Sequence, residues 1–144
     1  NISSCIIEYA SILLDLNSIM DVFHKQGEFV DLIVLIYDQF ALKCKEKALK
    51  LLLKMINYSK FFRNRILSID LSDTFILFLG NRDDAQIDIL LSFIEISLQL
   101  FNMKQIMPPI LDNLLQYDDF IPTFIEASEE VSNESLKSRM QIAL

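Results

Sequence analysis

Few side chains in this 144-residue sequence have the types and spacings that perform catalysis. His24 is the single histidine, and the sequence places no serine, cysteine or carboxylate beside it, so we expect a histidine near a helix end rather than a triad member. Three pairs of adjacent acids resemble catalytic carboxylates, but two of them open long helices, where they complement the helix dipole. We therefore expect no catalytic residue and no enzyme. The pairs are Asp83/Asp84, Asp118/Asp119 and Glu129/Glu130.

Cofactor and metal sites also lack their usual sequence signatures. The two glycines, Gly27 and Gly80, cannot build a phosphate-binding loop. Cys5 and Cys44 have no second cysteine or histidine at metal-ligand spacing, and two cysteines are too few for a disulfide framework. The sequence therefore predicts two buried thiols, no cofactor and no metal.

A basic segment is the main candidate for binding. Residues 43–65 hold eight of the 13 bases against one acid, Glu46. Four lysines at helical spacing form one stripe along a helix, which we call the lysine stripe: Lys43, Lys47, Lys50 and Lys54. An acidic peptide can lie along this stripe. Two alternatives are a solvated helix face that contributes only solubility, and pairing of Lys47 and Lys50 with Asp84 and Asp88 further along the chain.

Composition bounds the protein class. A net charge of −7 argues against a nucleic-acid binder, which needs a basic face. The chain is 52% apolar, yet charges interrupt each apolar stretch, as Asp88 and Glu95 do within residues 87–101, so we expect no membrane span. Without a recognisable signal peptide, a cytoplasmic location is expected. Because both ends fall in helical patterns, we also expect a fragment of a longer protein with apolar terminal helices available for self-association.

The periodicity of apolar residues predicts an all-helical chain. Ser72 and Asp73 are expected to cap one helix, Gly80-Asn81 to end it, and Ser132 or Asn133 to cap the last helix, whose weak apolar side comprises Leu136, Met140, Ile142 and Leu144. Leu115 is expected to face inward with Ile110, Leu111 and Leu114, and Phe61, Phe62, Phe75, Phe78 and Phe93 are expected in the core. The predicted helices cover residues 3–25, 28–40, 45–58, 61–69, 74–79 and 83–101, one starting at 107–109, one at 118–119, and 132–144.

A repeated pattern organises these helices. One constant shift along the sequence, which we call the repeat spacing, carries Glu8–Ala10 onto Glu46–Ala48 and Leu52-Leu53 onto Leu90-Leu91, as expected for stacked supersecondary units. The same spacing relates Lys50 to Asp88. Residues 27–36 look like the opening "G…I…L..L" segment of the armadillo repeat, and residues 46–56 resemble its "E.AL.AL.NL" third helix. The chain therefore resembles the armadillo family over residues 3–131, and HEAT repeats fit almost as well.

The resemblance implies a right-handed solenoid of about three repeats, in which the longest helix of each repeat lines a concave groove. The expected units are 1–26 (partial), 27–69, 70–106 and 107–131, with a C-terminal helix 132–144, in one helical domain. A non-repetitive helical bundle is the alternative, because stacked amphipathic helices share one period whatever their topology. The groove of nuclear-import adaptors is not reproduced, since the chain has no Trp and places Lys54 and Ser92 at the family's asparagine positions.

From this resemblance we expect a protein–protein interaction scaffold. In its groove, Lys47, Lys50 and Lys54 contact an acidic partner segment, and Asp88, Ser92 and Glu95 form the neighbouring polar face. One alternative is a structural spacer or dimerisation segment of a larger scaffold or cytoskeletal protein, held by its apolar ends. The other is a helical bundle with a closed cavity for a small apolar ligand.

Overall fold

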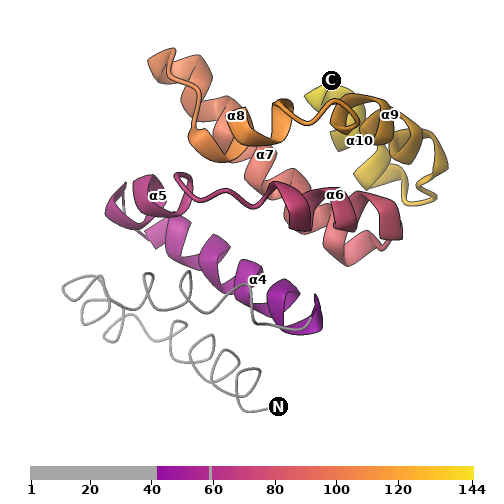
Figure 1. Cartoon of the computed structure of the whole chain (residues 1–144), viewed down its shortest axis with the longest axis horizontal. Coiled ribbons are helices and arrows are strands. Elements are labelled where there is room, and N and C mark those ends of the chain that lie inside the picture. The colour runs from indigo at the N-terminus through magenta and orange to yellow at the C-terminus, as the bar shows by residue number, and fades with distance from the viewer. Residues whose placement is uncertain (1–41, 59) are drawn as a thin grey trace. The chain divides into compact units, whose positions relative to one another are not determined.

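A computed structural model describes residues 42–58 and 60–144, and the fold given below is that of these residues (Figure 1). They form seven helices that include 81% of the described residues, and no strand occurs among them. The prediction of an all-α protein is confirmed for this part of the chain. The helices expected over 3–25 and 28–40, with Cys5, His24 and Gly27, lie outside the described residues. The chain divides into two compact units, residues 1–66 and 67–144.

The described part of the first unit consists of α4 (Leu42–Tyr58) and α5 (Lys60–Ile66), which pack on each other. One face of α4 buries residues at helical spacing, and Cys44 is among them as predicted. In α5, Phe62 and Ile66 lie one turn apart and both are buried, whereas Phe61 is exposed beside Arg65. The prediction that Phe61 lies in the core was wrong. Phe62 and Ile66 form the buried face of this short helix, and Phe61 lies outside that face. The buried α4 residues are Cys44, Glu46, Ala48, Leu49, Leu51, Leu52, Met55 and Ile56.

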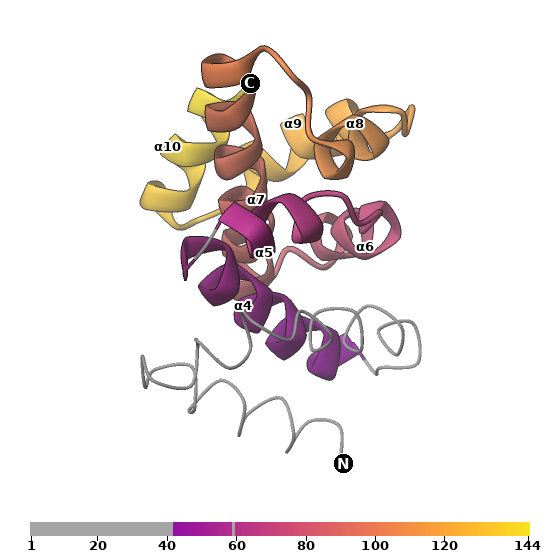
Figure 2. The same ribbon diagram turned by 90° about the vertical axis from the view of Figure 1, so that its left-hand side faces the viewer.

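The second unit contains five helices (Figure 2). They are α6 (Ser72–Asn81), α7 (Asp84–Lys104), α8 (Pro109–Leu115), α9 (Phe120–Glu130) and α10 (Glu134–Ala143). Helix α6 packs on α7, α8 and α9, while α10 packs on α7 and α9. Aromatic pairs join the core, with ring centroids 5.5 Å apart for Phe75 and Phe93 and 5.6 Å apart for Phe120 and Phe124.

Two predicted helix starts in this unit are correct. The side chain of Asp83 accepts hydrogen bonds from the backbone N–H groups of Ala85 and Gln86 at 2.9 and 3.1 Å, and so caps α7. Asn133 caps α10 in the same way. Pro109 occupies the first turn of α8, where its missing N–H costs no hydrogen bond.

The predicted cap at the start of α6 was wrong, whereas the helix does end at Asn81, with its left-handed residue one position later than predicted. Ser72 lies inside the helix, and its backbone N–H and hydroxyl both donate to the carboxylate of Asp70, at 3.1 and 2.7 Å. Gly80 and Asn81 are also helical, and the left-handed residue that ends α6 is Arg82, with φ 55°. Arg82 adopts this conformation although it is not glycine; its backbone N–H donates to the Leu79 carbonyl, and its guanidinium binds the α9 carboxylate of Glu130 at 2.8 Å.

Three predicted inward-facing residues are exposed. Leu115 ends α8 on the surface, and Ile142 and Leu144 at the end of α10 are 82% and 59% exposed. Leu136 and Met140 are buried as predicted, because they lie one turn apart on the face of α10 that meets α7 and α9. The apolar side of α10 is therefore confined to its middle.

Within the second unit, two consecutive pairs of helices pack on each other, first helix on first helix and second on second. The pair α6–α7 is followed by the pair α9–α10, with α6 against α9 and α7 against α10. The separation in sequence between the starts of α6 and α9 nearly equals the separation between the starts of α7 and α10. The repeat spacing is shorter than either separation, since it carries Asp84 onto Pro122 in α9 rather than onto α10. It is therefore not the spacing of these pairs.

Candidate functional site

The lysine stripe lies on α4, as its spacing predicts. Lys50 and Lys54 are exposed and Lys47 is half-buried, while the side chain of Lys43 lies outside the described residues. Glu46, one turn before Lys50, is buried, and its carboxylate is 3.8 Å from the Lys50 ammonium. The Lys50 ammonium is exposed and the Glu46 carboxylate is buried, so water screens this pair on the lysine side. The stripe therefore presents cationic side chains on the surface of α4.

The predicted polar face on α7 is bound by a residue that the sequence reasoning did not single out. Arg139 of α10 forms ion pairs with Asp88 and with Glu95, the latter at 2.7 Å between Nε and Oε1. Its Nη2 is 3.5 Å from the hydroxyl of Ser92, which itself donates to the Asp88 carbonyl at 2.9 Å. We call this group of four residues the arginine clamp. The hydrogen bond to Glu95 raises the pKa of Arg139, with Asp88 adding to the effect and desolvation opposing it.

The clamp also bears on the predicted lysine–aspartate pairs. Asp88 binds Arg139, and both residues belong to the second unit. Lys50 lies beside Glu46, and both belong to the first unit. Asp84 lies in the first turn of α7, next to the Asp83 cap. The spacing of the sequence correctly placed Asp88, Ser92 and Glu95 on one helix face, but no local signal marked Arg139, which is 44 residues beyond Glu95.

Two adjoining hollows flank the last turn of α10. The first, of about 240 Å³, is apolar and opens on the surface beside Leu115, Ile121 and Leu144, which are all exposed. The second, of about 730 Å³, is broader and has Glu95, Gln99, Asn102 and Arg139 among its lining residues. Leu98 and Ala143 border both hollows. The first is also lined by Ile94, Met107, Leu111, Phe120 and Phe124, and the second by Met103 and Ile142.

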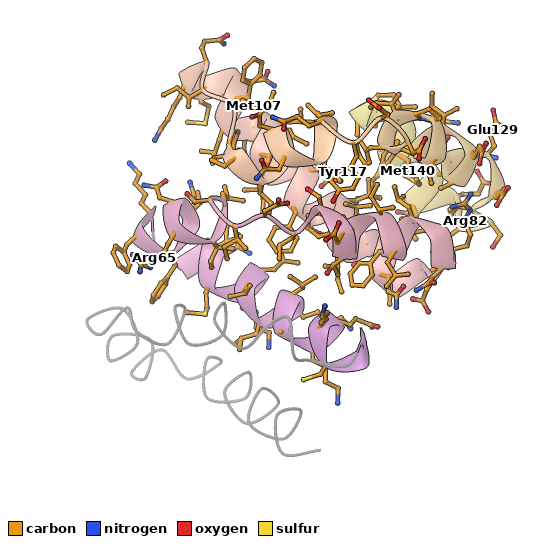
Figure 3. The ribbon with its side chains drawn as sticks, viewed as in Figure 1. Arg65, Arg82, Met107, Tyr117, Glu129 and Met140 are labelled. Carbon is orange, nitrogen blue, oxygen red and sulfur yellow. The ribbon has the colours of Figure 1, made fainter. Side chains whose placement is uncertain are left out.

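Three other polar or reactive groups stand out among the described residues. Burial raises the pKa of the Cys44 thiol, which makes the thiolate scarce at neutral pH. The Tyr117 hydroxyl donates to the Asp73 carboxylate, and this hydrogen bond raises the pKa of Tyr117. Arg82, labelled in Figure 3, links the end of α6 to Glu130 of α9. Within residues 42–58 and 60–144, no cluster of three or more metal-ligating side chains occurs.

Helix α7 is long and apolar enough, by length and composition, to cross a membrane, and it is the one described helix that meets both criteria. Of its most apolar 18-residue window, 44% is buried within the structure. Ile87, Leu90 and Leu91 are fully buried in the second unit. Core packing therefore accounts for part of the hydropathy of α7.

The chain was compared with protein-family models, curated proteins and solved structures, and it matches none of them.

Proposed function

We propose that this chain is a protein–protein interaction scaffold that binds an acidic segment of its partner along the lysine stripe of α4. The single observation that carries the proposal is the charge asymmetry of one segment, which includes most of α4 and all but the last residue of α5. Residues 43–65 hold eight bases and one acid, whereas the rest of the chain holds five bases and 19 acids. A local cationic surface on an otherwise acidic protein attracts anionic partners while the remaining surface repels them.

The geometry of α4 supports the same proposal. Its buried side chains occupy one face, so the helix is anchored by its core residues and the exposed Lys50 and Lys54 are held about one turn apart. The one acid in the segment, Glu46, is buried, so it presents little negative charge at the surface. An extended acidic peptide can contact successive lysines on such a stripe.

The proposal includes the finer architecture. We infer that α6–α7 and α9–α10 are successive units of a solenoid, which agrees with the stacking of α6 on α9 and α7 on α10. The repeat resemblance then assigns the longer helices to a concave surface. A non-catalytic role, without cofactor or metal, is part of the proposal.

Charge reversal tests the proposed function. The probe is a fluorescently labelled peptide of alternating glutamate and serine, titrated against the full chain at low and physiological salt. Lys50→Glu and Lys54→Glu should each weaken binding about three- to tenfold, since a charge reversal removes one attraction and adds one repulsion. The matched control is Lys104→Glu, which makes the same charge change at an exposed lysine of α7 and should leave binding nearly unchanged.

Two results would contradict this function. The first is an equal loss of binding in Lys50→Glu and Lys104→Glu, which would show that the net charge of the chain, and not the position of the lysines, determines binding. The second is tighter binding of a DNA duplex than of the acidic peptide, with the same dependence on Lys50 and Lys54. Added salt should weaken the specific complex, because exposed charges are screened over about 8 Å at physiological ionic strength.

A second candidate function is a spacer or dimerisation segment, and the exposed apolar residues of the second unit favour it. Met103, Ile106 and Ile142 are each more than two-thirds exposed. Clusters of large exposed apolar side chains mark interaction surfaces. Sedimentation of the full chain at rising concentration distinguishes the two functions: a dimer that Ile142→Ser abolishes supports the spacer, and a monomer throughout argues against it.

A further inference from the structure

Helix α10 lies along α7 and runs in the same direction. Arg139 reaches Asp88 near the start of α7 and Glu95 near its middle. Ala143, one turn later in α10, borders the same hollow as Leu98 and Asn102, which lie further along α7. Figure 2 shows the two helices side by side. Helix α10 therefore packs on a surface formed by α7 and α9, with α8 beside the hollow at its end, and we call this surface the groove.

The contacts of α10 follow one stripe at helical spacing. Leu136 and Met140, the latter labelled in Figure 3, are buried, and Ala143 is the next position at the i, i+4, i+7 spacing. Arg139 lies beside this stripe and supplies the charge in the arginine clamp. The groove therefore recognises two apolar side chains, one guanidinium and a third residue near the end of the helix.

The third position is poorly filled. Ala143 ends in a methyl group beside the apolar hollow of about 240 Å³, which also borders Ile94, Leu98 and Phe124. The adjacent Ile142 and Leu144 are mostly exposed. The groove thus offers apolar space at the position of Ala143 that α10 does not use.

Helix α10 also buries few of its residues. Leu136 and Met140 are the two buried residues of its ten, and both carboxylates of the clamp are exposed. Elements with little buried apolar surface open before the rest of a fold. A segment of this kind can yield its place to a helix that fits better.

We propose that this groove binds an amphipathic helix of a partner protein in place of α10. The partner helix carries apolar residues at the positions of Leu136 and Met140, an arginine at the position of Arg139, and a large apolar residue at the position of Ala143. The clamp carboxylates of Asp88 and Glu95 select the basic residue, and the apolar hollow selects the large one. This surface is separate from the lysine stripe, and its partner has the opposite charge, so either proposal can fail alone.

The test uses labelled peptides of residues 132–144 and the full chain, with binding measured by fluorescence anisotropy. The Ala143→Leu peptide should bind about tenfold or more tightly than the parent peptide, because the added side chain enters the apolar hollow. Arg139→Glu in that peptide should weaken binding about tenfold, because it removes two exposed ion pairs and adds repulsion from Asp88 and Glu95. The matched control is the Gln141→Leu peptide, which adds the same residue at an exposed position of α10 and should bind like the parent.

Variants of the full chain test the competition with α10. Arg139→Glu in the chain loosens α10 and leaves Asp88 and Glu95 in place, so it should tighten binding of the Ala143→Leu peptide. Ala143→Leu in the chain should weaken that binding and slow hydrogen exchange in α10, a readout that does not depend on any peptide.

Three outcomes would overturn the proposal. In the first, the Gln141→Leu substitution raises the affinity of the peptide as much as Ala143→Leu does. In the second, the Ala143→Leu peptide binds neither the unmodified chain nor its Arg139→Glu variant. The third outcome is a dimer of the unmodified chain that Arg139→Glu dissociates, since the occupant is then the α10 of a second copy.

Discussion

Met140 and Arg139 attach α10 to its neighbours by different forces, and substitution should separate the two. Met140 is fully buried, so Met140→Ala removes apolar contact and leaves a cavity, at a cost of about 2–5 kcal/mol. Arg139 is 30% exposed, and the carboxylates of Asp88 and Glu95 are 56% and 46% exposed. Water screens such pairs, so each contributes about 0–1 kcal/mol and Arg139→Ala should cost about 1 kcal/mol in total.

The assay combines urea unfolding with hydrogen exchange on the full chain. Urea midpoints report the loss of global stability, and amide exchange in residues 134–143 reports detachment of α10 alone. Gln141→Ala is the matched control, because Gln141 is exposed on the same helix and its truncation should change stability by less than about 0.5 kcal/mol. We expect the order of destabilisation to be Met140→Ala, then Arg139→Ala, then Gln141→Ala.

A larger loss for Arg139→Ala than for Met140→Ala would refute this reasoning. It would mean that the arginine clamp is worth more than its solvent exposure allows, and that α10 is held mainly by charge. A double-mutant cycle of Arg139→Ala and Glu95→Ala measures that coupling directly. A coupling of about 0.5–1 kcal/mol agrees with the exposed ion pair.

Three further predictions concern helix ends and pH. Asp83→Ala should lower stability by about 1 kcal/mol in urea unfolding, because two N–H groups of α7 lose their acceptor, whereas Asp84→Ala should cost less. Gln105→Gly should raise stability by about 1 kcal/mol in thermal unfolding, because Gln105 ends α7 in the left-handed region at φ 56°; a loss of stability would contradict this. The hydrogen bond to Asp73 raises the pKa of Tyr117, so its contribution to stability is complete below the ordinary value of 10.0 and is lost as pH rises through the folded-state pKa. Tyr117→Phe should therefore show a weaker decline of the urea midpoint above pH 10 than the unmodified chain, and an unchanged decline would rule out this role.

Apolar periodicity and cap chemistry predicted much of the second unit. The start of α7 at Asp83 depends on a side chain and backbone N–H groups two and three residues away, which sequence alone can place. The buried pair Leu136 and Met140 likewise follows from spacing within one helix. Both are local features, and they needed no knowledge of which helices are neighbours.

The features that the sequence did not reveal depend on contacts across the fold. Arg82 ends α6 in a left-handed conformation that sequence rules assign to Gly80, and its side chain is held by Glu130, 48 residues away. Arg139 meets Asp88 and Glu95 because α10 lies along α7, which no spacing within α10 indicates. The repeat spacing relates Lys50 to Asp88 and therefore predicted that these two residues pair. The helix that packs on α7 is α10, and the starts of α7 and α10 are further apart in sequence than the repeat spacing.

The type of basic residue differs between the ion pairs within the second unit, which use arginine, and the surface proposed for a partner, which uses lysine. Arg82 and Arg139 each hold two carboxylates of another helix, a task that suits the planar guanidinium with its five fixed donors. The stripe on α4 uses lysine at each of its four positions. Lysine presents a compact, strongly hydrated charge on a flexible stem, which adapts to acids in varied positions. This difference is a physical reason to seek an acidic partner at α4, and a helix that supplies its own arginine at the groove of α7.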